Sequence, residues 1–278
     1  MSLHLLESLG LVTIGGQDAS KLLQGQLTIN PEKITNSEFS MAAVCNHQGR
    51  CIAVFWITRE SDSFQCVMPK ANIENFISHL KKYAVFYKVE IDSPESSIIG
   101  SVENSEVIPR DIDSNTIESL KMINSQFAHI KLSVHPPLAS AADLENESNW
   151  FVELAKAGIC WIDDKGSSSF LPHNINLPNL GAVDFKKGCF TGQEVIARMQ
   201  YKGKLKSHLQ LLTADQPLSV HTGEKLECEG KNCGEVVCSA VLDGNVTYVL
   251  VILKDSYLNS KNFQLASKNE PILKLSEK

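Results

Sequence analysis

Residues 186–204 of the 278-residue chain read KKGCFTGQEVIARMQYKGK and hold a single cysteine, Cys189, between two glycines. Thr191 and Glu194 have the spacing of a capping box, which predicts that a helix begins at Thr191. Gly203 stands where a left-handed residue would end that helix. The pattern therefore places Cys189 just before a helix N-terminus.

The surroundings of Cys189 indicate a reactive thiol. Free backbone N–H groups and the positive end of the dipole gather at a helix N-terminus, and Lys186 and Lys187 add charge, so the thiolate is favoured over the thiol. Gly188 and Gly192 let the backbone approach a ligand closely. The alternative is a cysteine buried as a small apolar residue, the ordinary role of cysteines in cytosolic chains.

Composition sets limits on partners and location. The chain is 43% hydrophobic and 21% charged, as expected for a soluble globular protein, and its net charge of −6 argues against nucleic acid bound over a whole face. The N-terminal stretch has no basic region and is interrupted by Glu7, so it is not a signal peptide. No apolar run approaches the roughly 20 residues that span a bilayer. We expect a soluble, cytoplasmic protein without membrane contact.

The chain has eight cysteines, which in a reducing compartment we interpret mostly as packing residues. Cys228, Cys233 and Cys238 are spaced five apart. Zinc sites of the ribbon type use C-x-x-C pairs, so this spacing does not predict a metal site. The odd spacing also favours side chains on different faces of neighbouring strands.

The first part of the chain has the pattern of an α+β layer. The stretch 15–28 predicts a short helix capped by Asp18 and ended at Gly25. Residues 51–59 and 64–69 predict the two strands of a hairpin, and residues 87–91 a further strand. An amphipathic helix lies between them, because apolar residues recur at helical spacing at Ile73, Phe76, Ile77 and Leu80.

Two polar stretches and a change of pattern divide the rest. Residues 92–119 are polar and acidic with Arg110 as their one basic residue, which predicts a loop-rich excursion, and 140–150 form a second polar break. Residues 225–254 alternate short apolar runs with glycine turns, the pattern of a small antiparallel barrel. We expect a domain of residues 1–205 followed by a C-terminal barrel of residues 206–278.

The stretches FKKGCFTGQEVIAR (185–198) and FLPHNINLPNLGAVDF (170–185) resemble the YgfZ-type folate-binding proteins, relatives of the aminomethyltransferase (T-protein) of the glycine cleavage system. The resemblance covers nearly the whole chain. It implies an α+β, T-protein-like folate-binding fold with a small C-terminal antiparallel β-barrel and a central channel for tetrahydrofolate. It also implies a role in maintaining iron–sulfur client enzymes, including those that thiolate tRNA.

The match identifies candidate site residues. It carries over Thr191, Gly192 and Glu194 and makes Cys189 the expected reactive centre. The residues expected to contact the folate are Lys187, Gly188, Gln193 and Arg198.

The chain departs from the family at two positions. Glu153 or Leu154 stands where an arginine is usual, and His173 replaces a glutamine. We interpret His173 as a hydrogen-bonded surface or channel residue rather than a ligand.

The resemblance leaves three functions to compare. Aminomethyltransferases carry aspartates in the first hairpin, whereas HQGRCIAVFW (47–56) has no carboxylate. Because a positioned acid or base contributes about 10²- to 10⁴-fold, we expect a folate-binding accessory protein rather than a transferase. The alternatives are a folate-dependent one-carbon transferase and a tRNA-binding module. The tRNA-binding module would use the basic residues Lys186, Lys187, Arg198, Lys202, Lys204 and Lys206.

Overall fold

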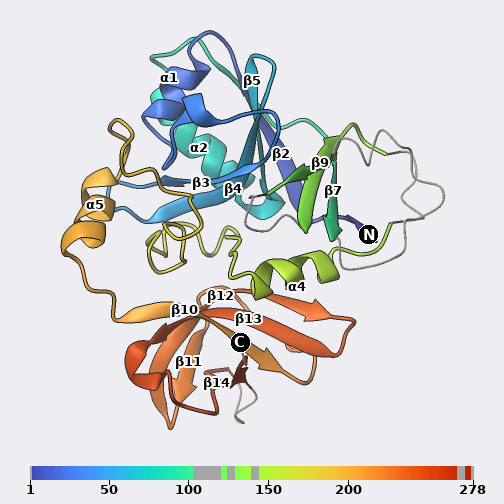
Figure 1. The fold of residues 1–278 in the computed structure, drawn as a ribbon, viewed down its shortest axis with the longest axis vertical. Helices are drawn as coiled ribbons and strands as arrows, with labels where there is room; N and C mark the ends of the chain where they lie inside the picture. The colour runs from blue at the N-terminus through green and yellow to red at the C-terminus, as the bar shows by residue number, and fades with distance from the viewer. Residues whose placement is uncertain (1, 103–119, 124–128, 139–143, 268–272, 277–278) are drawn as a thin grey trace.

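The computed structural model describes residues 2–102, 120–123, 129–138, 144–267 and 273–276. These residues form three antiparallel sheets, with helices packed on the first two and between the second and third (Figure 1). None of the helices in these ranges is long and apolar enough to cross a membrane.

The first sheet has the strand order β3-β4-β5-β2-β6. Its strands are β2 (Leu9–Gly15), β3 (Ser40–Cys45), β4 (Cys51–Glu60), β5 (Ser63–Pro69) and β6 (Glu90–Asp92). The predicted hairpin is confirmed, because β4 and β5 pair antiparallel. The predicted amphipathic helix is also confirmed as α2 (Ile73–Ala84). Its Phe76 and Leu80 are fully buried in a cluster that contains Val12 and Phe55 of the sheet.

The short helix α1 (Ala19–Gln24) has the predicted bounds but lacks the predicted side-chain cap. Asp18 makes no side-chain cap. Its carboxylate instead accepts hydrogen bonds from the backbone N–H of Lys88, at 3.0 Å, and from the ammonium of Lys21, at 3.0 Å. Asp18 therefore fastens the segment after α2 to the start of α1. Two 3₁₀ turns, Pro31–Lys33 and Lys70–Asn72, complete the connections.

The second sheet corrects the prediction for residues 92–119. Its strand order is β1-β7-β9-β8, with β1 (Ser2–Leu5), β7 (Ser97–Val102), β8 (Lys121–Met122) and β9 (Ile130–His135). The sequence predicted a loop-rich excursion in this stretch. The structure instead has β7 there as an inner strand, with Ile98 and Ile99 buried. The six apolar and small residues of β7 are enough for an inner strand, although polar residues surround them. The rest of that stretch, 103–119, lies outside the described residues.

Helix α4 (Ser148–Lys156) begins inside the second predicted polar break. Trp150 is fully buried and packs edge-on against Trp56, with ring centroids 5.5 Å apart. Gly100 of β7 lies directly under Trp150, since a Cβ there would be 2.5 Å from the indole. The part of the break at 139–143 lies outside the described residues.

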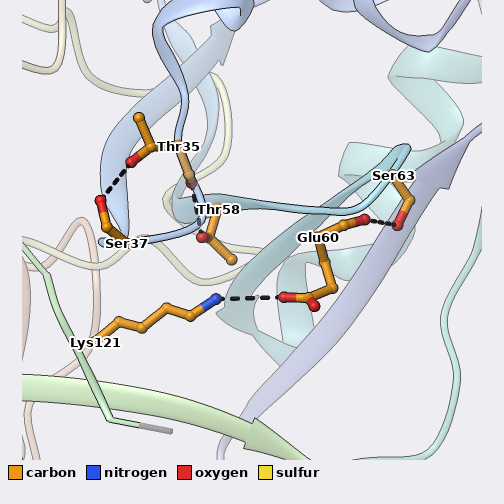
Figure 2. A network of polar contacts seen from close by, with 6 residues as sticks. All are labelled: Thr35, Ser37, Thr58, Glu60, Ser63 and Lys121. Carbon is orange, nitrogen blue, oxygen red and sulfur yellow. Dashed lines mark hydrogen bonds and ion pairs between the residues drawn. The ribbon is translucent and has the colours of Figure 1, made fainter.

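Polar contacts lie where the β4–β5 turn of the first sheet meets the second sheet (Figure 2). Lys121 of β8 forms an ion pair with Glu60, at 3.4 Å, and the backbone carbonyl of Glu60 accepts from the Ser63 hydroxyl, at 3.0 Å. The buried Thr58 hydroxyl donates to the carbonyl of Thr35, at 3.1 Å. The Lys121–Glu60 pair thus joins the β4–β5 turn to β8, and the other two contacts brace the end of β4.

The third sheet is a curled antiparallel half-barrel with the order β14-β11-β12-β13-β10-β15, which confirms the predicted barrel-like pattern (Figure 1). Its strands are β10 (Ser207–Ala214), β11 (Lys225–Cys228), β12 (Lys231–Leu242), β13 (Val246–Lys254), β14 (Gln264–Leu265) and β15 (Lys274–Leu275). A 3₁₀ turn, Asp255–Tyr257, follows β13. The division into 1–205 and 206–278 stays a prediction.

Both faces of the half-barrel are buried. Cys233 and Val236 lie in the cluster inside the half-barrel, whereas Val237 and Cys238 lie in the large cluster that also contains Trp150 of α4. A β-bulge between Val236 and Cys238 shifts the register at this point. The predicted placement of the spaced cysteines on different faces therefore holds for Cys233 and Cys238.

Candidate functional site

The start of α5 (Gln193–Lys202) corrects the predicted capping box. The N-cap is Gly192, in the left-handed region at φ 83°, and no side chain caps the helix. Thr191 instead turns toward the N-terminal segment, where its N–H donates to the carbonyl of Gly25, at 3.0 Å, and its hydroxyl to Oε1 of Gln26, at 3.2 Å. A Cβ on Gly192 would lie 2.5 Å from the Asn46 carbonyl. The tertiary contact with the β3–β4 turn thus replaces the local cap.

The end of α5 is only partly as predicted. Gly203 does end the helix, but its backbone is extended, with φ −83° and ψ 151°, rather than left-handed. A Cβ on Gly203 would lie 2.6 Å from the Met199 carbonyl. The glycine is therefore needed for a close approach to the last turn and not for positive φ.

Cys189 is exposed, whereas the other seven cysteines are buried. Burial raises the pKa of the Cys51, Cys66 and Cys160 thiols, so these thiols stay protonated. The interpretation of most cysteines as packing residues is confirmed. The segment around Cys189 is held on both sides, because Lys187 and Phe190 are buried.

The Lys187 side chain points into the protein and donates hydrogen bonds to backbone carbonyls. Its ammonium donates to the carbonyls of Gln24, at 2.8 Å, and Leu27, at 2.6 Å, and lies 5.0 Å from the ring centroid of Phe190. Burial lowers the pKa of Lys187 to about 8, which the charge of Asp184 partly opposes. Lys187 therefore ties the cysteine segment to the residues that follow α1.

The other residues expected to contact folate lie around the same turn. A Cβ on Gly188 would be 3.0 Å from the amide nitrogen of Gln24. Gln193 closes its own turn, since its Oε1 accepts from the N–H of Phe190 at 3.3 Å. Arg198 is exposed on α5. The roles of Lys187, Gly188, Gln193 and Arg198 as folate contacts stay predictions.

A buried polar chain links α2 to the cysteine segment, and sequence reasoning missed it. Oε1 of Gln26 accepts from Nε2 of His79, at 2.9 Å, as well as from Thr191. Burial, with the nearby charge of Lys82 as a smaller cause, lowers the pKa of His79 to about 4, so the ring is neutral near pH 7. The sequence does contain one sign of this chain. His79 lies three residues after Phe76, on the apolar face of α2, where a polar side chain needs a buried partner.

The first hairpin packs on the start of α5. Oδ1 of Asn46 accepts from the backbone N–H of Gln48 and Arg50, at 2.9 and 3.0 Å, and the Arg50 guanidinium donates to the carbonyl of Ser169. A Cβ on Gly49 would lie 3.0 Å from Val195. Residues 46–50 therefore build a tight turn beside the Cys189 segment.

A cavity of about 920 Å³ lies at the other end of α5, between α4, α5 and the half-barrel. His173 borders it and donates from Nε2 to Oε1 of Gln200, at 3.2 Å, while its Nδ1 is buried with no partner among the described residues. Burial lowers the pKa of His173. The interpretation of His173 as a hydrogen-bonded channel residue fits these contacts. The cavity is lined further by polar side chains that include Lys156, Asn176, Asn179, Gln210 and Tyr248.

The thiol and the cavity are separate places. The cavity lining includes Gln200 but not Lys187, Gly188, Cys189, Gln193 or Arg198. Gln193 and Gln200 are seven residues apart on α5, which at 1.5 Å per residue is about 10 Å. The signature residues and the cavity therefore lie toward opposite ends of one helix.

The departures at 153 and 154 have local explanations. Leu154 is fully buried in the core under α4. Glu153 forms an ion pair with Lys156, at 2.7 Å, and the same ammonium lies 5.4 Å from the ring centroid of Tyr248. A cation at the cavity wall is thus supplied by Lys156. Among the described residues, no group of three or more His, Cys, Asp or Glu side chains could hold a metal ion.

Two of three comparisons with known proteins found similar proteins. No family model matches the chain. The tRNA-modifying protein YgfZ of Escherichia coli O157:H7 is 30% identical over 280 residues, covering 92% of this chain and 86% of that protein. The same protein of Escherichia coli strain SMS-3-5 is 29% identical with the same coverage. The crystal structure of the glycine cleavage system aminomethyltransferase T from Bartonella henselae matches with a TM-score of 0.70 at 13% identity, over 100% of this chain and 85% of that chain.

Proposed function

Since the chain belongs to the family of the tRNA-modifying protein YgfZ, we propose that it supports tRNA modification as a folate-binding accessory protein. In this proposal the cofactor is tetrahydrofolate, and the clients are iron–sulfur enzymes, including those that thiolate tRNA. Cys189 is the reactive centre. The protein does not transfer aminomethyl groups.

The observation that carries the proposal is the placement of Cys189. It is the exposed cysteine of eight, on a segment that Lys187 and Thr191 fasten to the residues after α1. A thiol that only filled space would be buried like the other seven. An exposed thiol on a fixed backbone is instead available to a partner protein or a small molecule.

The 920 Å³ cavity has the size and chemistry for a folate. His173, Asn176 and Gln200 contribute polar side chains to the lining of this cavity. Lys156 supplies positive charge for a glutamate carboxylate. Folate would supply one-carbon chemistry on its pterin nitrogens, and the cavity residues bind and orient it.

Titration separates the two places where folate could lie. A ligand selective for the native state raises the melting temperature with its concentration, so tetrahydrofolate is expected to stabilise the wild-type protein. His173→Ala should reduce this shift if folate fills the cavity, whereas Arg198→Ala should reduce it if folate lies at the signature residues. Absence of any shift in the wild type would remove folate from the proposal.

The role of the thiol is tested by Cys189→Ser in a strain that lacks the protein. Serine is hardly ionised at neutral pH, so the variant should fold and bind folate normally but fail to restore tRNA thiolation. Melting and folate titration of the purified variant are the controls. Full rescue by the serine variant would show that the thiol is not needed.

A one-carbon transferase remains the second candidate because of the shared fold. The argument against it is the stretch 47–56, which has no carboxylate and forms the turn against Gly192. An assay with an aminomethylated carrier protein and tetrahydrofolate is expected to show no turnover. Measurable transfer would assign the protein to the transferases.

A further inference from the structure

The turn after α2 exposes apolar side chains among lysines. Val85, Phe86 and Tyr87 are 76%, 82% and 37% exposed, and the lysines on both sides are exposed as well. No acidic residue occurs from position 75 to 89, although the whole chain is acidic. We propose that this surface, the α2 tip, is a docking site for a single-stranded segment of RNA. The α2 tip consists of Lys81, Lys82, Val85, Phe86, Tyr87 and Lys88.

The α2 tip has a fixed backbone. The N–H groups of Phe86 and Tyr87 donate to the carbonyls of Tyr83 and Ala84, at 3.3 and 2.9 Å. The Asp18 carboxylate accepts from the N–H of Lys88, and the Asp18 N–H donates to the Lys88 carbonyl, at 3.2 Å. Phe86 is thus presented to solvent on an ordered turn, so stacking a base on it does not require the turn to be ordered first.

The chemistry of the α2 tip favours RNA over a protein. Every base has a π-face that stacks on an exposed aromatic ring, and lysines neutralise the phosphates beside it. Lys81 and Lys82 make no ion pair with any described carboxylate, and Asp18, which holds the turn, is already paired with Lys21. Protein interfaces are depleted in lysine relative to the rest of the surface, whereas here lysines surround the aromatic residues.

The α2 tip lies on the same side of the molecule as the cysteine segment (Figure 1). Helix α1 joins them, with Asp18 bonded to Lys88 at one end and Gln24 against Gly188 at the other. Six residues of helix span about 9 Å. An RNA strand on the α2 tip can therefore follow α1 toward Cys189. This last step rests on the proposed function, whereas the docking itself does not.

The test measures binding of a fluorescently labelled 12-nucleotide oligouridine by anisotropy at low salt. Phe86→Ala should weaken binding by about 5- to 100-fold, since a stacked base contributes that much. Phe86→Tyr should retain affinity. Lys82→Gln should make the salt dependence shallower by about 0.7 in log K against log salt.

Matched variants distinguish this surface from others. Tyr201 is a 72% exposed aromatic residue beside Lys202 on α5, in the basic segment that is the other candidate for RNA binding. Tyr201→Ala, and Lys231→Gln on the half-barrel, should leave the affinity unchanged. Thermal melting checks that each variant is folded, and folate titration of Phe86→Ala should match the wild type.

Three outcomes would overturn the proposal. In the first, the wild-type protein does not bind oligouridine. In the second, Phe86→Ala binds it as tightly as the wild type, and in the third Phe86→Leu does so. The leucine variant keeps an apolar side chain but loses the π-face, so its full affinity for oligouridine would show that no base stacks on this ring. None of these outcomes affects the folate or thiol experiments.

Discussion

Just before α5 the side chains of Lys187 and Thr191 make hydrogen bonds within the protein, whereas Gln200 toward the end of the helix borders an open cavity. Lys187 donates to the carbonyls of Gln24 and Leu27, and the Thr191 hydroxyl donates to the Gln26 side chain. His173, whose buried Nδ1 has no partner among the described residues, borders a space of about 920 Å³. The two ends of α5 therefore differ in role. The signature residues hold the backbone that exposes Cys189, whereas polar residues outside the signature line the cavity proposed for a ligand.

The largest effect is expected for Lys187→Met. The substitution removes the donor for the Gln24 and Leu27 carbonyls, and the free energy of unfolding should fall by about 2 to 4 kcal/mol. Urea unfolding measures the loss, and Lys186→Met at the exposed neighbour is the control. A loss below about 1 kcal/mol together with lost folate binding would make Lys187 a ligand contact and reverse the comparison.

A smaller effect is expected from the protonation of His79, which supports Thr191 through Gln26. Its folded pKa of about 4 is below the ordinary value of 6.5, so an unfolded chain takes up a proton that the folded chain excludes. This contribution is fully present above pH 6.5 and is lost as the pH falls toward 4. Stability should fall by about 1 to 2 kcal/mol between pH 7 and 5, and His79→Gln should flatten that slope. An unchanged slope would show that the ring is not desolvated.

The smallest effect is expected for His173→Gln at the cavity. Because Nδ1 has no partner, little is lost, and the free energy of unfolding should change by less than about 0.5 kcal/mol. Folate affinity should persist, since a glutamine amide offers an acceptor at the same wall. Denaturant unfolding and folate titration measure the two quantities. A loss comparable to that of Lys187→Met would mean that both ends of α5 are structural.

Local patterns predicted the elements that local forces determine. The helical spacing of Phe76 and Leu80 gave α2, and the apolar runs on either side of a polar turn gave the β4–β5 hairpin. The capping box failed because Gly192 lies against Asn46, a contact 146 positions away in the chain that no local pattern contains. Strand β7 was missed because it has only a few apolar residues, and the hydrophobicity of the whole stretch 92–119 is dominated by the polar residues around them.

The site was predictable in part. The sequence favoured a reactive thiol at Cys189 over a buried packing residue; the side chain is exposed, and its reactivity stays a prediction. The direction of the Lys187 side chain was not, because a lysine beside a cysteine reads equally as a source of positive charge or as a donor to distant carbonyls. His173 and Lys156 come together at one cavity wall only through the packing of α4 against the loop before α5, which the sequence does not display.

The two-faced strand β12 has a consequence for synthesis. The cluster around Trp150 also contains Val237, Cys238 and Leu250, which are synthesised after α4 and the loop that follows it. An emerging chain that ends before β12 lacks these side chains and leaves the core under α4 open. The central core therefore closes only after β12 and β13 have been synthesised, and until then its apolar surface is open to aggregation.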